Sequence, residues 1–133
     1  MSKLKTYIVE DSPVIRQSLI ATLEELAPVE VVGMAEDELT AVQWLTRAEN
    51  QVNLVIVDIF LKSGSGLGVL RAISTMAHQR RVVVLSNYAT PDMQRKCLAL
   101  GADRVFDKSN DIDLLIQYCN RLESGDNGQG KPE

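Results

Sequence analysis

Histidine, cysteine and aromatic residues are scarce in this sequence. It has one histidine, His78, and two cysteines, Cys97 and Cys119. So few imidazole and thiolate groups exclude a clustered zinc site. Each cysteine falls in the apolar stripe of a predicted helix, and we therefore expect two small buried thiols rather than a disulfide framework.

A basic excess and long apolar runs are missing as well. Lys and Arg number 14 against 18 Asp and Glu, which gives a net charge of −4, and no stretch concentrates the basic residues. This composition excludes an electrostatic grip on nucleic acid. No run is apolar enough to span a membrane, and residues 1–5 lack the apolar segment of a secretory signal. We therefore expect a soluble, cytoplasmic protein with neither nucleic-acid nor membrane partners.

What the sequence does contain is a hydrophobic period that switches repeatedly between strand and helix. Strands are predicted over residues 4–9, 29–34, 53–58, 81–86 and 104–107, and helices over 12–26, 38–49, 67–77, 90–100 and 112–122. The length suits one compact domain over residues 1–123. Residues 124–133 have no apolar side chain to bury, and we expect a flexible tail there.

The first predicted helix shows how local signals define such an element. Ser12 is placed as its N-cap and Pro13 as its first helical residue. An apolar stripe follows at helical spacing, formed by Ile15, Leu19, Leu23 and Leu26.

Alternation of five strands with five helices predicts an α/β fold with a doubly wound parallel sheet. The strands have no polar alternation, so both faces of the sheet must be covered by helices. For this number of strands we expect the order 2-1-3-4-5. Ligand chemistry then belongs in the crevice beyond the carboxyl ends of strands 1 and 3.

Polar side chains stand at the carboxyl ends of four of these strands. Glu10 and Asp11 follow the first, Asp58 ends the third, Ser86 ends the fourth and Lys108 follows the fifth. Carboxylates a few ångströms apart repel by several kcal/mol per pair at an effective dielectric of ~20, so the predicted cluster requires a cation. Hard oxygen ligands favour Mg²⁺ over zinc or copper.

A carboxylate beside Mg²⁺ can attack a phosphoryl group and form an aspartyl phosphate. Glu10 and Asp11 would hold the metal from the first strand, which leaves Asp58 on the central strand as the acceptor. Phosphoryl transfer needs mainly positioning and charge neutralisation. Ser86 can donate a hydroxyl hydrogen bond to the new phosphoryl oxygens, and Lys108 can donate a charge-assisted one.

In this arrangement the chain resembles the receiver domain of two-component response regulators, over residues 4 to about 122. The resemblance rests on "VEDS", "IVDIFLKSGSG", "VVVLS" and "GADRVFDKS" in this order at the predicted strand ends. It implies a flavodoxin-like (βα)5 fold, with Glu10, Asp11 and Asp58 as Mg²⁺ carboxylates. It also implies Asp58 as phosphoacceptor, Ser86 as hydroxyl switch, Lys108 as phosphate sensor and the Phe60 backbone carbonyl as a further metal ligand.

Several positions depart from the family pattern. Lys62 stands where proline is common, so the loop after Asp58 is expected to be less rigid. Ser109 replaces the proline that usually follows the lysine, and without proline a cis bond costs about 2.5 to 4 kcal/mol. The sequence leaves the isomer of that bond open. The resemblance also places Phe60 and Tyr88 beside the path of hydrolytic water, where two aromatic rings would slow the loss of phosphate.

The resemblance implies partners rather than a substrate. The phosphoryl donor would be a sensor histidine kinase or a histidine phosphotransfer protein. Phosphorylation would change the surface that binds partners, which is formed by the helix at 90–100, the strand at 104–107 and the last helix. No effector domain follows in the sequence, so we expect output through a downstream protein, self-association as a homodimer, or onward phosphoryl transfer. The domain would catalyse only its own modification and would not be an enzyme that turns over a separate substrate.

Other functions fit the pattern less well. A haloacid dehalogenase-type phosphatase needs a second aspartate two residues after the nucleophile, where Phe60 stands. The segment "GSGLGV" lacks the third glycine of a dinucleotide fingerprint and follows the third strand instead of the first. A degenerate receiver that acts as a phosphorylation-independent interaction module stays open as the alternative.

Overall fold

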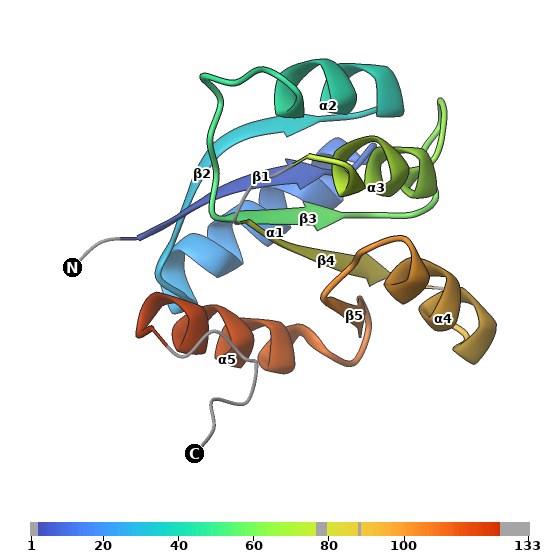
Figure 1. The fold of residues 1–133 in the computed structure, drawn as a ribbon. Helices are drawn as coiled ribbons and strands as arrows, with labels where there is room; N and C mark the ends of the chain where they lie inside the picture. The colour runs from blue at the N-terminus through green and yellow to red at the C-terminus, as the bar shows by residue number, and fades with distance from the viewer. Residues whose placement is uncertain (1–2, 77–79, 88, 126–133) are drawn as a thin grey trace.

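Strands and helices alternate along the whole described chain in a computed structural model that describes residues 3–76, 80–87 and 89–125 (Figure 1). The strands are β1 (Leu4–Val9), β2 (Val29–Ala35), β3 (Leu54–Val57), β4 (Arg81–Ser86) and β5 (Arg104–Asp107). The helices are α1 (Pro13–Leu26), α2 (Glu38–Leu45), α3 (Gly66–Ser74), α4 (Pro91–Ala99) and α5 (Ile112–Glu123).

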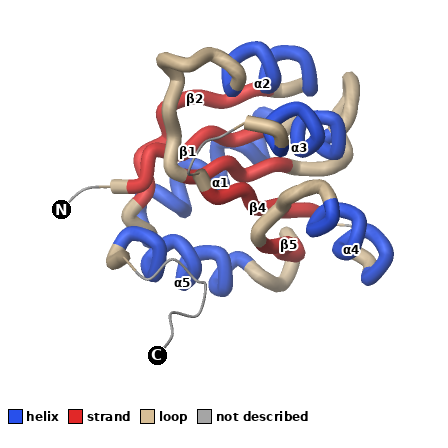
Figure 2. Tube along the Cα trace, in the orientation of Figure 1, coloured by secondary structure: helices blue, strands red, loops and turns tan. Residues whose placement is uncertain are grey.

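The five strands form one sheet in the order β2-β1-β3-β4-β5, and each neighbouring pair among them is parallel. This confirms the predicted fold class and strand order. Figure 2 shows the strands as a central layer with helices on both sides. Because all strands run the same way, the residues that follow β1, β3, β4 and β5 leave the sheet at one edge.

Two apolar cores lie on opposite faces of the sheet. Side chains of α2, α3 and α4 pack on one face, with Leu45, Leu70 and Cys97 fully buried among them. On the other face α1 and α5 contribute residues such as Leu23 and Leu115. Strands buried on both faces explain the continuous apolar runs of the sequence.

The helix α1 begins as predicted but buries a different stripe. The Ser12 side chain accepts a hydrogen bond from the Ile15 N–H, which confirms the N-cap. The buried residues of α1 are Arg16, Leu19 and Leu23, whereas Ile15 is 40% and Leu26 56% exposed. Of the expected stripe, only its two central leucines belong to the core.

Two helices end earlier than the sequence predicts. α2 ends at Leu45 instead of residue 49. The Thr46 hydroxyl and the Asn50 amide donate hydrogen bonds to the Val42 and Trp44 carbonyls, which also accept from the backbone N–H groups of Thr46 and Arg47. The Arg47 N–H bonds the carbonyl three residues back instead of four, so the last turn tightens and the α-helical pattern ends. α3 ends at Ser74 instead of residue 77, and the Ser74 hydroxyl donates to the Arg71 carbonyl.

The two cysteines are free and buried, as expected. Cys97 of α4 and Cys119 of α5 belong to different cores on opposite faces of the sheet. Among the described residues, no helix has the length and apolarity that crossing a membrane would need. The predictions for Tyr88 and for most of the tail concern positions outside the described residues.

Candidate functional site

Three carboxylates from two neighbouring strands meet at the carboxyl edge of the sheet. Glu10 and Asp11 directly follow β1, and Asp58 directly follows β3. The Asp58 N–H donates a hydrogen bond of 3.0 Å to the Val9 carbonyl, which continues the pairing of β1 with β3. One carboxylate oxygen from each of Glu10, Asp11 and Asp58 lies within 4.8 Å of the others. The sheet register therefore brings together side chains that are remote in the sequence.

Lys108 lies between two of these carboxylates. Its ammonium nitrogen is 2.6 Å from Glu10 Oε1 and 2.9 Å from Asp58 Oδ2. The Lys108 N–H also donates to the Ser86 carbonyl at 3.1 Å, so the end of β4 fixes the backbone that carries the lysine. Glu10 and Asp58 are 2% and 7% exposed, and these ion pairs are largely shielded from water.

Burial and charge act against each other in this cluster. Burial raises the pKa of Glu10 above its ordinary value, although hydrogen bonds from Lys108 and from the Ser12 N–H oppose that rise. Burial alone would lower the pKa of Lys108, but its hydrogen bonds to Glu10 and Asp58 outweigh burial and raise the pKa. Lys108 therefore stays protonated at neutral pH and supplies a fixed positive charge.

Two other predicted site residues lie next to the cluster. Ser86 ends β4, pairs with Asp107 of β5 in the sheet, and is 1% exposed. Phe60 donates its N–H to Asp58 Oδ1 at 3.3 Å, and its side chain is half exposed. That hydrogen bond comes from the backbone of Phe60 and ties the residue to the Asp58 carboxylate.

The Lys108–Ser109 bond, which the sequence left open, is trans, since the described residues contain no cis peptide bond. The Ser109 hydroxyl donates to Asn87 Oδ1 at 3.3 Å and so links the loop after β5 with the loop after β4. Tyr88, the second aromatic residue expected beside the path of hydrolytic water, is outside the described residues.

Arg16, which the sequence pattern did not single out, supports the same edge of the sheet from α1. Its guanidinium donates to the Glu10 carbonyl at 2.8 Å and to Glu36 at 3.2 Å. Arg16 thereby fixes the backbone of a metal-ligand candidate. The spacing of Arg16, Leu19 and Leu23, at i, i+3 and i+7, is the signal that places an arginine on the buried face of this helix.

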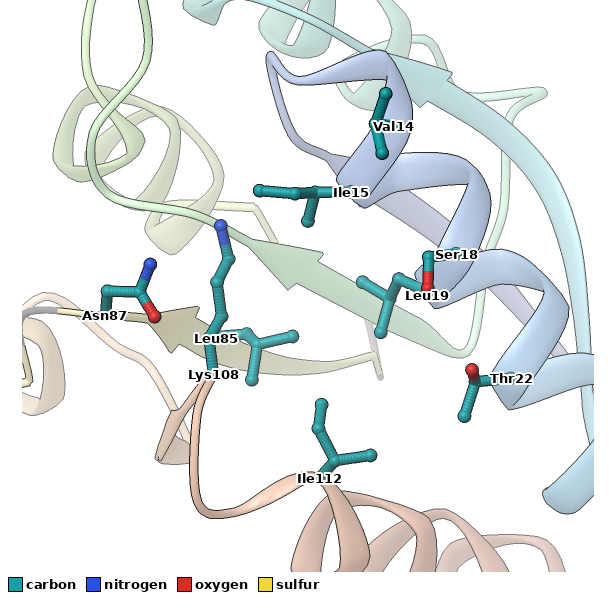
Figure 3. A pocket seen from close by; sticks show the side chains of 9 residues that line it. All are labelled: Val14, Ile15, Ser18, Leu19, Thr22, Leu85, Asn87, Lys108 and Ile112. Carbon is teal, nitrogen blue, oxygen red and sulfur yellow. The ribbon is translucent and has the colours of Figure 1, made fainter.

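An apolar cavity of about 400 Å³ opens beside the cluster, between α1, the end of β4 and the start of α5 (Figure 3). Lys108 and Asn87 line it together with Leu85 and Ile112, and Val14 and Ile15 line it from the first turn of α1. Val14 is 78% exposed. The site therefore has an apolar surface directly beside its charged centre.

The donor set fits a hard divalent cation. Three carboxylates and one ammonium leave two negative charges, and every candidate ligand atom is oxygen. Mg²⁺ prefers such ligands and usually keeps several waters, which can be exchanged for phosphate oxygens. Glu10, Asp11, Asp58 and the Phe60 carbonyl are the groups that could hold it.

Comparison with known proteins identifies a family. The model of the family described as "response regulator receiver domain" matches residues 6–120. Fimbriae Z protein of Salmonella typhimurium is 25% identical over 125 residues, which cover 94% of this chain. A protein-glutamate methylesterase/protein-glutamine glutaminase of Myxococcus xanthus is 36% identical over 87 residues, which cover 65% of this chain.

Solved structures show the same fold. The signal receiver domain of the response regulator NarL from Mycobacterium tuberculosis superimposes with a TM-score of 0.81 at 19% identity, covering 97% of this chain and 100% of that one. The response regulatory domain of protein mrkE from Klebsiella pneumoniae gives 0.79 at 24% identity, covering 95% of this chain and 100% of that one. The matches to the longer Salmonella and Myxococcus proteins span 59% and 24% of their lengths.

Proposed function

Because this chain belongs to the family of response regulator receiver domains, we propose that it accepts a phosphoryl group on Asp58 from a phosphohistidine donor. The observation that carries this proposal is the position of the Asp58 carboxylate. One oxygen is 2.9 Å from the Lys108 ammonium, and the group shares the acidic cluster with Glu10 and Asp11. The donor would be a sensor histidine kinase or a histidine phosphotransfer protein.

In the transfer, a carboxylate oxygen of Asp58 attacks the phosphorus atom. The new bond joins that oxygen to phosphorus, the bond from phosphorus to the donor's imidazole nitrogen breaks, and its electron pair leaves with the imidazole. When bound, Mg²⁺ would neutralise the negative charge that the carboxylates and phosphoryl oxygens bring together. Lys108 would exchange its contact with Asp58 for a charge-assisted hydrogen bond to a phosphoryl oxygen.

The apolar surface beside the site suits a protein donor. Val14 and Ile15 of α1 stand exposed at the cavity that Lys108 also lines. A donor side chain that approaches Asp58 would bring neighbouring apolar residues over this surface. Docking there would place the imidazole next to the acceptor, which is the positioning that phosphoryl transfer requires.

The response to the phosphoryl group would start at Ser86. Its hydroxyl would donate to a phosphoryl oxygen, and the loop after β4 would follow. The populations of states of α4, β5 and α5 would shift, since the added group interacts with these states differently. Leu98 of α4 and Leu114 of α5 are each about half exposed. They suit contact with a downstream protein or a second copy of the chain.

Intact-mass measurement with acetyl phosphate and Mg²⁺ tests the proposal. The wild-type protein should gain the mass of one phosphoryl group, whereas Asp58→Asn should gain none. Removing Mg²⁺ with EDTA should abolish the gain in the wild type. A folded wild-type protein that stays unmodified would instead support an interaction module that works without phosphorylation.

A further inference from the structure

The loop at residues 59–65 connects the acceptor Asp58 to α3 and folds back on itself. Phe60 and Ser65 form an antiparallel bridge, and the Gly66 N–H donates to the Ile59 carbonyl at 2.9 Å. The last residues of the loop therefore determine where Phe60 lies. Residues 59–65 contain no proline, so no ring fixes a backbone angle within the loop.

Glu38, the first residue of α2, contacts this loop at two points. Its carboxylate Oε1 accepts a hydrogen bond of 2.9 Å from the Ser65 N–H. Its own N–H donates to the Ser63 carbonyl at 3.2 Å. A single residue, remote from the loop in sequence, therefore binds the backbone just before the bridge with Phe60 and at the bridge itself.

Two glycines leave the space that the Glu38 side chain occupies. A Cβ atom on Gly64 would lie 2.4 Å from the Glu38 Cβ, and one on Gly68 would lie 2.2 Å from Glu38 Oε2. Gly64 also has a φ of +79°, a conformation that favours glycine. The loop and the start of α3 thus lack side chains at the two places where side chains would displace Glu38.

We propose that Glu38 is a positioning residue, which holds the 59–65 loop so that Asp58 and the Phe60 carbonyl keep the geometry needed for a divalent cation. This inference rests on the proposed function, since it assigns Glu38 to the same site. Glu38 acts through Ser65 and the Phe60 bridge and contacts none of the reacting atoms. Residues that orient metal ligands in this way typically contribute 10- to 100-fold, by order of magnitude, to metal affinity.

Direct titration with Mn²⁺, followed by the electron paramagnetic resonance signal of the free ion, measures the effect without phosphoryl transfer. Glu38→Ala should weaken Mn²⁺ binding by about tenfold. Glu38→Gln should keep most of the affinity, since its amide oxygen can still accept from Ser65. Glu49→Ala, which removes an exposed carboxylate after α2, is the matched control and should bind as the wild type does.

Gly68→Ala provides a second variant that leaves Glu38 in place. Alanine favours the helix more than glycine does, so α3 should still form. The added methyl group should push the Glu38 carboxylate away from Ser65 and weaken Mn²⁺ binding to the same degree as Glu38→Ala. In the Glu38→Ala background, Gly68→Ala should have no further effect on Mn²⁺ binding, because both changes remove the same contact between Glu38 and Ser65.

Amide hydrogen exchange of Ser65 separates the contact from the function. Exchange should be faster in Glu38→Ala than in the wild type and in Glu38→Gln. Wild-type affinity in Glu38→Ala, or an equal loss in Glu38→Gln, would overturn the inference while the proposed function stands. A wild-type protein that binds no Mn²⁺ would remove the metal site itself, and with it this role of Glu38.

Discussion

Tyr7 buries a phenolic hydroxyl group in the core between the sheet and α2. The residue is 1% exposed, and among the described residues its hydroxyl has no hydrogen-bond partner. Burial, with a smaller contribution from Asp37, raises its pKa from the ordinary value of 10.0 to about 12. The fold therefore favours the neutral phenol strongly.

Tyr7→Phe should stabilise the protein, because it removes a buried donor that the fold leaves unpaired. The expected gain in the free energy of unfolding at pH 7 is about 1 kcal/mol. Since the folded pKa lies above the unfolded one, the stability linked to the neutral phenol is present below pH 10 and is lost as the pH rises from 10 to 12. Two pKa units correspond to roughly 3 kcal/mol.

Urea unfolding of both proteins between pH 7 and pH 12 checks this prediction. The advantage of Tyr7→Phe over the wild type should widen above pH 10. A constant difference across that range would show that the pKa of Tyr7 is the same in the folded and the unfolded protein. Lower stability of Tyr7→Phe at pH 7 would show that the hydroxyl has a partner in solution.

At the residue scale, the sequence predicts site residues that stand at strand ends and misses those that act from helices. Glu10, Asp58 and Lys108 could be placed together because parallel strands finish at one edge of the sheet. Glu38 could not be placed, since its contact with Ser65 depends on how α2 is oriented over the loop. No periodic pattern in the sequence encodes that orientation.

At the scale of elements, β2 depends on a glycine where it passes Tyr7. The register of β1 with β2 shifts between Thr6 and Tyr7, and Tyr7 is then paired with Gly33. A Cβ atom on Gly33 would lie 2.8 Å from the Tyr7 ring. That ring is stacked on Trp44 of α2, with ring centroids 4.3 Å apart. Strand, glycine and helix therefore form one packed unit.

Gly33→Ala should lower the free energy of unfolding by about 1 to 3 kcal/mol, the usual cost of overpacking a core. The Tyr7 ring would have to move, and the Trp44 ring stacked on it would move as well. Urea unfolding followed by Trp44 fluorescence measures both effects. Val32→Ala, at a position 38% exposed on the same strand, should have a smaller effect. Equal losses in the two variants would contradict the packing argument.

The ends of elements were the least predictable feature at this scale. α2 stops after Leu45, where the Arg47 N–H bonds the Trp44 carbonyl three residues back, while the apolar pattern of the sequence runs on to Ala48. Periodicity reports which face of a helix is buried. It does not report where the backbone hydrogen bonds shorten from four residues to three and the helix ends.

At the scale of the whole molecule, the strand order could be predicted because few arrangements satisfy the constraints on a parallel sheet. Apolar runs without alternation require helices on both faces, and short crossovers then restrict the topology. The position of the acidic cluster follows from that order. The packing of α1 was predicted wrongly at its start, because Arg16 takes the buried place that was expected for the apolar Ile15.

Mg²⁺ should stabilise the entire fold, because only the folded chain assembles the three carboxylates. At a Mg²⁺ concentration ten times its dissociation constant, the gain in the free energy of unfolding should be about 1.4 kcal/mol. Asp11→Asn should reduce this gain, since it removes one ligand. Urea unfolding with Mg²⁺, against NaCl at equal ionic strength, measures the effect. The same gain in both proteins would argue against binding at this cluster.

The central claim is that Asp58, among the clustered carboxylates, is the one that takes the phosphoryl group. Borohydride reduces an acyl phosphate of aspartate to homoserine, so peptide mass spectrometry after treatment with acetyl phosphate, Mg²⁺ and borohydride locates the modified residue. We predict homoserine at position 58 and at no other position, and none when EDTA is present. Homoserine at position 11, or an unmodified residue 58 in the folded protein, would contradict the account.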